Sequence, residues 1–177
     1  MLYAIECNFD AVSEQKIVNL WKKLEEIGIT TPHSKALRPH ITLSIGEADD
    51  LELICENFKP ICSVEKPFPI TFNHIGIFPN KELVLYLGLN VTAEIVAWHQ
   101  KVNNLLLCYL ENPWSYYLPD NWTPHCTLSD NVQPELIPEA ITQAKALPLP
   151  MEVTVSGMSV HTLDPVKYLK SFVLKVS

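Results

Sequence analysis

Hydrophobic residues recur along the chain with two spacings, every second residue in some stretches and every third or fourth in others. The first spacing is typical of strands that bury one face, and the second is typical of helices that bury one stripe. Glycine, proline and capping residues mark where these stretches begin and end. For the first half they predict a strand over 2–8, a helix from Asp10 or Ser13 to Gly28, a loop over 29–38, a strand that stops at Gly46, a helix over 49–58, and a hairpin of strands 68–78 and 82–91.

The second half shows the same succession of helix, strand, helix and hairpin patterns, which indicates an internal duplication. Mixed helices and strands that end in hairpins predict the α+β class, with antiparallel sheets flanked by helices. No low-complexity linker divides the chain, so we expect one domain over 1–177. The elements expected here are a helix over 93–110 capped by Thr92, an irregular loop over 111–123, a strand to Asp130, a helix over 134–146, and a hairpin of strands 151–163 and 168–176.

Composition narrows what this domain binds and where it works. The net charge of −7 argues against tight, sequence-independent binding of long nucleic acid, which depends on basic residues that displace counterions. The five cysteines are widely spaced and form no C-x-x-C pair, which predicts reduced thiols in a cytoplasmic protein. The first residues carry no signal-peptide pattern, and no apolar run approaches the ~20 residues that span a bilayer, so we expect no membrane association.

Two short segments repeat almost letter for letter. Pro-His-Ile-Thr-Leu-Ser at 39–44 and Pro-His-Cys-Thr-Leu-Ser at 124–129 match at five of six positions. Because strand side chains alternate between faces, the histidine, threonine and serine of each segment are predicted to share one polar face, with the apolar residues on the other. The proline that heads each segment is tolerated at the start of a strand. The residues predicted on the two polar faces are His40, Thr42 and Ser44, and His125, Thr127 and Ser129.

Two such strands facing each other across a cleft would place two imidazoles on opposite sides of one phosphate. In-line displacement at phosphorus needs a base at the attacking oxygen and an acid at the leaving oxygen. Histidine suits both roles because its reference pKa of about 6.5 allows either protonation state near neutrality. The hydroxyls of Thr42 and Thr127 can donate to the non-bridging oxygens.

Three other interpretations of the histidines are weaker. A single strand histidine is usually a hydrogen-bonded structural residue, but here the same His-x-Thr falls twice on the polar face. A catalytic zinc would need about three protein ligands, and each strand offers one, so we expect no metal and no cofactor. Cys126 is a poor nucleophile for this site because its side chain is predicted to point away from His125.

Further residues are candidates for binding the substrate. Arg38 is the only arginine and lies two residues before His40, so its planar fork of donors could reach a phosphate, with Lys35 a weaker candidate of the same kind. Aromatic side chains near the motifs could stack on a nucleobase. Those near the motifs or on the first hairpin are Phe78, Tyr86, Tyr116, Tyr117 and Trp122.

Arg-Pro-His-Ile-Thr-Leu at 38–43 and Thr-Pro-His-Cys-Thr-Leu at 123–128 resemble the paired His-x-Thr signatures of the 2H phosphoesterase superfamily, especially its RNA ligase-like branch. The resemblance implies a bilobal α+β fold with pseudo-twofold symmetry around a central cleft. It implies metal-independent opening of 2′,3′-cyclic phosphates to 2′-phosphates, or the joining and cleavage of 2′–5′ linkages. By the same resemblance, His40 and His125 are the acid–base pair, and Thr42 and Thr127 are the phosphate donors. We expect His125 to be the base and His40 to be the acid that protonates the 3′-oxygen, but the near-symmetry of the two motifs leaves the reverse assignment open.

The chain departs from this pattern in its charge. Asp130, and no basic residue, follows the second motif, which favours a nucleotide cyclic phosphate or a short RNA end as the partner. A self-contained bilobal site predicts a monomer. A non-catalytic module that binds nucleotides or RNA ends in the same cleft is the alternative, and product formation separates the two.

Overall fold

The computed structural model describes residues 1–175, so the last residue of the expected strand 168–176 lies outside the described part of the chain. Within it the chain forms seven strands and four α-helices, with short 3₁₀ helices over Pro32–Lys35, Ser115–Tyr117 and Pro134–Leu136. The elements are β1 (Leu2–Phe9), α1 (Ala11–Glu26), β2 (His40–Glu47), α2 (Leu51–Val64), β3 (Phe68–Phe78), β4 (Val84–Leu89), α3 (Ala93–Leu106), β5 (His125–Ser129), α4 (Ile137–Ala144), β6 (Met151–Leu163) and β7 (Val166–Val173).

Every strand pair is antiparallel, which confirms the α+β class, and all seven strands join in one sheet. The order is β2-β1-β6-β3-β4-β5, with β7 added to β6. The long strand β6 makes this continuity possible: residues 151–155 pair with β3, and residues 157–163 pair with β7. The sheet therefore has two four-stranded arms, β2-β1-β6-β7 and β5-β4-β3-β6, that share β6.

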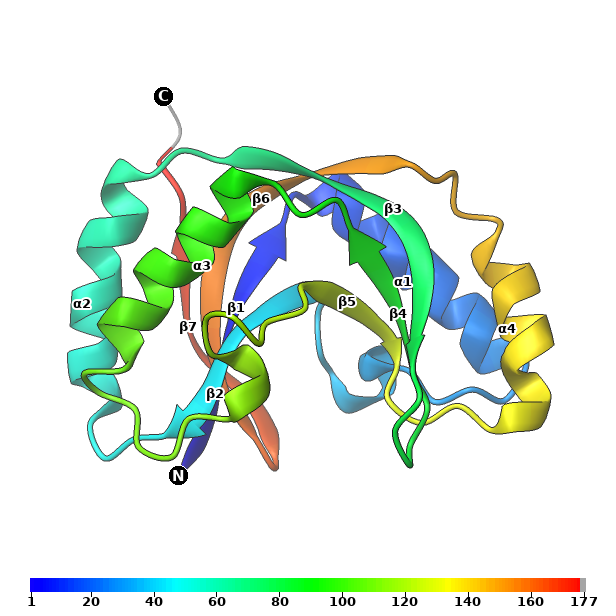
Figure 1. Ribbon diagram of the computed structural model, residues 1–177, viewed down its shortest axis with the longest axis horizontal. Helices are drawn as coiled ribbons and strands as arrows, with labels where there is room; N and C mark the ends of the chain where they lie inside the picture. The colour runs from blue at the N-terminus through cyan, green and yellow to red at the C-terminus, as the bar shows by residue number, and fades with distance from the viewer. Residues whose placement is uncertain (176–177) are drawn as a thin grey trace.

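The two arms curve toward each other, and each is covered on its outer side by two helices (Figure 1). Helices α2 and α3 contact β7 and β2 of the first arm, while α1 and α4 contact each other over the second. Each motif strand, β2 and β5, is the outermost strand of its arm, and the two contact one another where the arms meet. The duplicated, bilobal arrangement is thus present, with the motif strands at equivalent places.

Local sequence explains the first helix well. Asp10 caps α1 by accepting hydrogen bonds from the backbone N–H groups of Val12 and Ser13. The predicted apolar stripe is buried, and Gly28 follows the helix with φ of 87°, a left-handed conformation that favours glycine. The buried side chains on this stripe are Ile17, Leu20, Trp21 and Leu24.

Some predicted boundaries were wrong. Strand β2 runs through Gly46 to Glu47, because the loop at Leu110 and Glu111 comes close to the Gly46 backbone and exchanges two backbone hydrogen bonds with Glu47. Helix α2 continues past Pro60 to Val64, since its buried face extends to Cys62. The predicted helix over 93–110 ends earlier, at Leu106, and the one over 134–146 begins with a 3₁₀ turn. No helix within residues 1–175 is long and apolar enough to cross a membrane.

Candidate active site

The two motif strands bury one face and present the other to the space between the arms. Ile41, Leu43, Cys126 and Leu128 are fully buried, whereas the histidines and threonines of both motifs are only partly buried. The two motif strands also contact each other, β2 against β5. The prediction that the apolar residues lie on the core face is therefore confirmed for Ile41, Leu43, Cys126 and Leu128.

The two motif histidines are held in the same way. Nδ1 of His40 lies 2.7 Å from the carbonyl oxygen of Arg38, and Nδ1 of His125 lies 2.7 Å from that of Thr123. Because a carbonyl oxygen only accepts, each Nδ1 must carry the hydrogen. Each ring thus has Nε2 as the nitrogen that gains or loses a proton.

Electrostatics couples the two imidazoles. Burial lowers the pKa of His125, the Thr123 carbonyl acts in the opposite direction, and positive charge on His40 lowers it further. The strands that carry the two rings, β2 and β5, contact each other. The fold therefore assembles the two histidines that sequence spacing selected.

The motif serines do not share the site, which corrects the prediction for Ser44 and Ser129. Both are buried, and the hydroxyl of Ser129 donates to the Thr30 carbonyl oxygen at 2.7 Å. The pairing explains why. A β-bulge interrupts each strand after its threonine, so that Ser44 lies opposite Ile5 and Ser129 opposite Leu85, both core residues.

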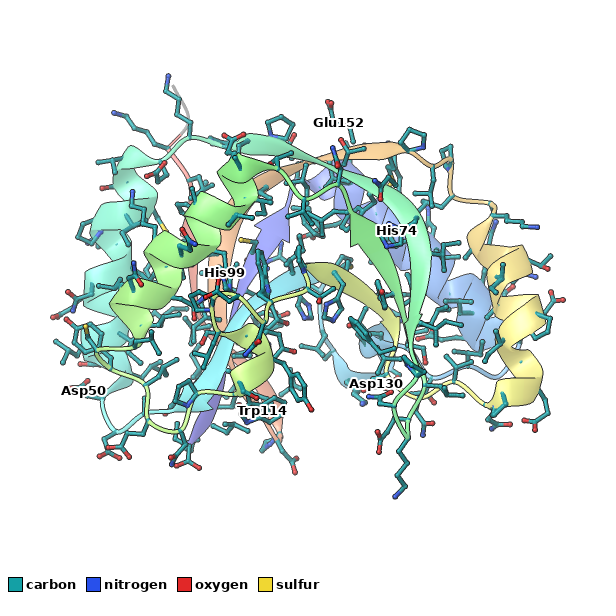
Figure 2. All side chains as sticks on the ribbon, viewed as in Figure 1. Asp50, His74, His99, Trp114, Asp130 and Glu152 are labelled. Atoms are coloured by element: carbon teal, nitrogen blue, oxygen red, sulfur yellow. The ribbon has the colours of Figure 1, made fainter. Side chains whose placement is uncertain are left out.

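An indole supports each bulge. Trp122 Nε1 donates to the Thr42 carbonyl oxygen at 2.9 Å, and Trp21 Nε1 donates to the Thr127 carbonyl oxygen at 3.2 Å. Trp122 also stacks on the His99 ring, with centroids 3.8 Å apart; Figure 2 shows His99 on α3. One face and the N–H of Trp122 are therefore already engaged, and its role as a platform for a nucleobase stays a prediction for the other face.

Aromatic side chains surround the second histidine. Phe78 and Tyr86 lie with their ring centroids 4.9 Å and 5.3 Å from the His125 ring, and they stack on each other at 4.3 Å. Gly76 makes room for Tyr86, because a Cβ there would lie 2.3 Å from the Tyr86 ring. Two of the predicted substrate-binding residues thus lie beside His125, while Tyr117 lies at the end of the 3₁₀ helix Ser115–Tyr117.

The basic residues near the motifs are already paired. Arg38 contacts Glu14 at 2.6 Å, and Lys35 forms an ion pair with Asp130, the residue that follows β5; Figure 2 shows Asp130 at the edge of the second arm. The side chains of both pairs are exposed except that of Glu14, which is partly buried. Arg38 remains the nearer candidate for phosphate, since its backbone holds His40, but its guanidinium would have to share its charge with Glu14.

A buried carboxylate lies behind the first histidine, and sequence reasoning missed it. Glu6 on β1 is fully buried and accepts hydrogen bonds on both oxygens. Burial disfavours its charge, but the attraction of His40 and hydrogen bonds from His161 and Ser159 hold its pKa at about 2. A glutamate inside the strongly hydrophobic strand 2–8 was the available signal. The atoms that contact it are Asn8 Nδ2, Ser159 Oγ, Tyr168 OH, His161 Nε2 and His40 Nδ1.

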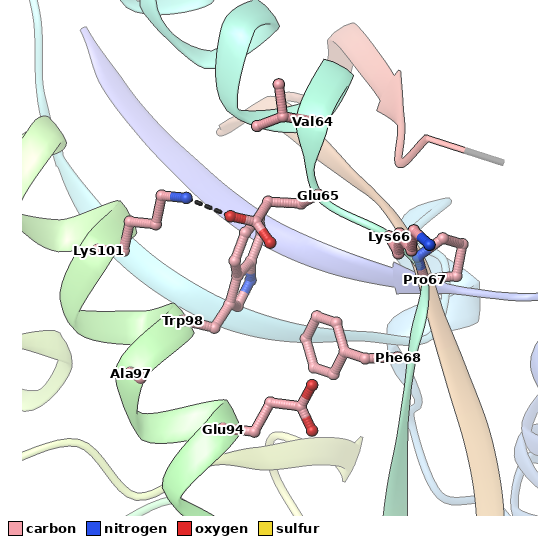
Figure 3. A pocket seen from close by; sticks show the side chains of 9 residues that line it. All are labelled: Val64, Glu65, Lys66, Pro67, Phe68, Glu94, Ala97, Trp98 and Lys101. Atoms are coloured by element: carbon pink, nitrogen blue, oxygen red, sulfur yellow. Dashed lines mark hydrogen bonds and ion pairs between the residues drawn. The ribbon is translucent and has the colours of Figure 1, made fainter. Parts of the chain in front are cut away.

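Two features outside the motif strands bear on other candidate sites. Across 1–175, no three His, Cys, Asp or Glu side chains converge in an arrangement that could hold a metal ion. A pocket of about 490 Å³ lies between the end of α2, the start of β3 and α3 (Figure 3). The ion pair of Lys101 with Glu65 crosses it, and none of its lining residues belongs to a motif strand. The motif strands therefore remain the candidate site.

Comparison with known proteins agrees with this geometry. Residues 14–166 match the model of a family described as the 2′-5′ RNA ligase superfamily. The chain belongs to this superfamily. Membership confirms the resemblance drawn from the two His-x-Thr motifs, while a search of curated protein sequences gives no significant match.

Solved structures share the fold of this superfamily member at low sequence identity. TT0787 of Thermus thermophilus is 18% identical, with a TM-score of 0.61 and 98% of both chains covered. E. coli LigT in its apo form is 15% identical, with a TM-score of 0.61 and coverage of 99% of this chain and 98% of that one. Kluyveromyces marxianus Usb1 is 13% identical, with a TM-score of 0.55 and 98% of both chains covered. These similarities establish the fold.

Proposed function

We propose that the protein is a metal-independent phosphodiesterase that opens 2′,3′-cyclic phosphates of nucleotides or short RNA ends to 2′-phosphates, and that the same site accepts 2′–5′ linkages. One observation carries the proposal. The two motif strands contact each other, and the histidine on each has its Nδ1 hydrogen committed to a backbone carbonyl, at Arg38 and at Thr123. The two Nε2 atoms are thereby left to act as a base and an acid on one phosphate.

The chemistry is an in-line displacement. Nε2 of neutral His125 takes a proton from water as the water oxygen bonds to phosphorus. The bond from phosphorus to the 3′-oxygen breaks, and protonated His40 gives that oxygen its Nε2 proton. The product carries a 2′-phosphate and a 3′-hydroxyl, and the proton is returned when His125 passes it to solvent and His40 is reprotonated.

The environment of His125 supports its role as the base. Burial lowers the pKa of His125, so that this ring is neutral at neutral pH and ready to accept a proton. The histidine with a carboxylate beside it is His40, whose Nδ1 lies 3.3 Å from Glu6 Oε2. Among the ion pairs described for residues 1–175, none places a carboxylate beside His125 in the same way.

The threonines and aromatic rings complete the proposed site. Thr42 and Thr127 follow each histidine by two residues on the same face, where their hydroxyls can donate to the non-bridging oxygens of the phosphate. Phe78 and Tyr86 offer an apolar wall beside His125 for a nucleobase or ribose. Small ligands fit this picture: LigT, which shares the fold, has been crystallised with 3′-AMP and with ATP.

The decisive test measures turnover of the four nucleoside 2′,3′-cyclic phosphates and of 2′–5′ dinucleotides in the presence of excess chelator. We expect hydrolysis to continue with chelator and to yield 2′-phosphates, identified by chromatography against both isomers. Turnover that disappears with chelator would overturn the metal-independent mechanism. Tight binding of a 2′-phosphorylated nucleotide with no product from any substrate would instead support a binding module.

A further inference from the structure

The two motif strands pair with their neighbours in the same register but meet different residues. Thr42 lies opposite Glu6 on β1, and Thr127 lies opposite Tyr86 on β4. Directly opposite residues of antiparallel strands project from the same face. The duplicated frame therefore places a carboxylate on one side of the site at the position where it places a phenol on the other.

Glu6 is held as an anion by four hydrogen-bond donors and by its ion pair with His40. Its Oε1 accepts from Ser159 Oγ at 2.7 Å, Asn8 Nδ2 at 3.0 Å and Tyr168 OH at 3.1 Å. Its Oε2 faces the imidazole nitrogens of two histidines, at 3.1 Å from His161 and 3.3 Å from His40. A carboxylate that accepts this many hydrogen bonds stays ionised although it is buried, in line with its pKa of about 2.

His161, on β6, balances this charge. Its Nε2 faces the ionised Glu6, and its Nδ1 lies 2.9 Å from the Thr162 carbonyl oxygen. Both nitrogens face acceptors, so both carry hydrogens and the ring is an imidazolium. Burial lowers the pKa of His161, but the hydrogen bond and charge of Glu6 outweigh burial and raise it. The buried pair is therefore ionic.

His40 shares the same carboxylate oxygen. Its Nδ1 faces both Glu6 Oε2 and the Arg38 carbonyl oxygen, which fixes the hydrogen on Nδ1 and the ring orientation. The rings of His40 and His161 are 6.3 Å apart. The charge that His40 feels is thus the negative charge of Glu6 less the positive charge of His161. Among the described ion pairs, none places a carboxylate on His125.

We propose that Glu6 and His161 are a positioning pair that orients His40 and sets its charge, and so makes His40 the acid of the two otherwise equivalent histidines. Neither residue touches the substrate in this proposal. The carboxylate promotes protonation of His40, and the imidazolium limits that effect so that His40 can still release its proton. The difference in role between His40 and His125 then originates on β1 and β6, behind the first motif strand.

The other titratable groups around Glu6 and His161 are either neutral or paired with another charge. Burial raises the pKa values of Cys7 and Cys126 to about 12, and the negative charge of Glu6 adds to both, so these thiols are neutral. Burial and Glu6 likewise raise the pKa of Tyr168, which stays a neutral phenol. On α1, Glu14 pairs with Arg38, which offsets its charge.

Two substitutions should move the titration of His40 in opposite directions. Glu6→Gln removes the negative charge, so the midpoint of the His40 ring titration should fall by about one to two pH units. His161→Gln removes the positive charge but keeps a donor toward Glu6, so the midpoint should rise by about one unit. NMR of ring-labelled histidines measures both, with the His40 signals identified by their loss in His40→Gln.

The kinetic readout rests on the proposed function, whereas the NMR readout does not. In the pH dependence of kcat/KM for a 2′,3′-cyclic phosphate, the alkaline limb reports the acid. That limb should move down in Glu6→Gln and up in His161→Gln, with a smaller change in the acid limb. If the wild-type protein turns over no cyclic phosphate, the proposed function fails, and the NMR shifts still decide this inference.

Tyr168→Phe is the matched control, because it removes one hydrogen bond to Glu6 without changing a charge. Its His40 midpoint should move by less than half as much as in either charge-changing variant. If Glu6→Gln does not fold, His161→Gln against Tyr168→Phe carries the test. Shifts in the same direction, no shift, or a shift in Tyr168→Phe as large as in His161→Gln would overturn the proposal.

Discussion

The two halves of the site share a backbone frame and differ in what surrounds it. On β2 and on β5 the histidine donates to a carbonyl two residues earlier, a bulge follows the threonine, and an indole N–H supports the threonine carbonyl. Behind His40 lies the buried, ionic Glu6, whereas beside His125 lie Phe78 and Tyr86. Duplication has kept the parts that position the imidazoles, and divergence has changed the parts that set their charge.

This difference separates two demands that a single histidine would have to satisfy together. A base must be neutral and an acid must be protonated at the same pH. An apolar neighbourhood favours the neutral ring and a carboxylate favours the charged one. One strand frame can therefore serve both purposes if the residues on the neighbouring strands differ, beginning with the residue opposite the threonine, which is Glu6 in one half and Tyr86 in the other.

The largest expected effect separates the acid from the base by leaving group. His40→Ala and His125→Ala should each slow hydrolysis of a 2′,3′-cyclic phosphate by about 10²- to 10⁴-fold, since each removes one proton transfer. A p-nitrophenyl phosphodiester releases a leaving group that departs as an anion and needs no proton. Only His40→Ala should recover most of its loss on that substrate, as measured by nitrophenolate absorbance.

Circular dichroism of both variants serves as the control for folding. Equal recovery in His40→Ala and His125→Ala would contradict the assignment of different roles. Recovery in His125→Ala alone would reverse the assignment, making His40 the base.

The threonines should behave alike where the histidines differ. Thr42→Val and Thr127→Val each remove one hydroxyl donor at nearly constant volume, and each should lower kcat by about 10²-fold with little change in KM. Thr→Ser at the same positions keeps the donor and should retain most activity. A loss confined to one threonine would contradict this equivalence and would show that the phosphate lies closer to one motif strand than to the other.

Sequence alone predicted the parts of this site that period and repetition encode. The alternation in 39–44 and 124–129 placed His40, Thr42, His125 and Thr127 on one face, because a strand of regular pleat leaves no other choice. It failed for Ser44 and Ser129, since a bulge inserts one residue and moves the next side chain to the core. Bulges depend on pairing between strands, which one strand does not reveal.

The supporting residues were beyond sequence reasoning for the same reason. Glu6 and His161 are 155 positions apart and meet only because β1 and β6 pair. Trp21 was read correctly as part of the buried stripe of α1, but nothing local showed that its N–H would reach the carbonyl of Thr127 in the opposite half. Local elements were predictable, whereas partners across the sheet required the register.

The indoles should matter about equally for geometry but unequally for stability. Trp122→Phe removes the donor to Thr42 from a partly buried site and should cost about 1 kcal/mol in the free energy of unfolding. Trp21→Phe removes the donor to Thr127 from a fully buried ring, leaves a cavity as well, and should cost about 2–3 kcal/mol. Urea unfolding followed by circular dichroism measures both, and equal costs would contradict the difference in burial.

The smallest expected effect tests the aromatic neighbourhood itself. Burial lowers the pKa of His125, and the Phe78 ring, 4.9 Å away, supplies part of that burial. Phe78→Ala should admit water and raise the pKa of His125 by about half a unit toward its ordinary value. A base works above its pKa, so the acid limb of kcat/KM should move to higher pH, and activity near pH 6 should fall more than activity near pH 8. NMR titration of the His125 ring measures the shift directly.

Phe78→Leu keeps an apolar cover and should move the His125 titration less, while the His40 titration should stay in place in both variants. A shift of both rings together would mean that the two environments are not separate, and that the acid and base are set by one shared field.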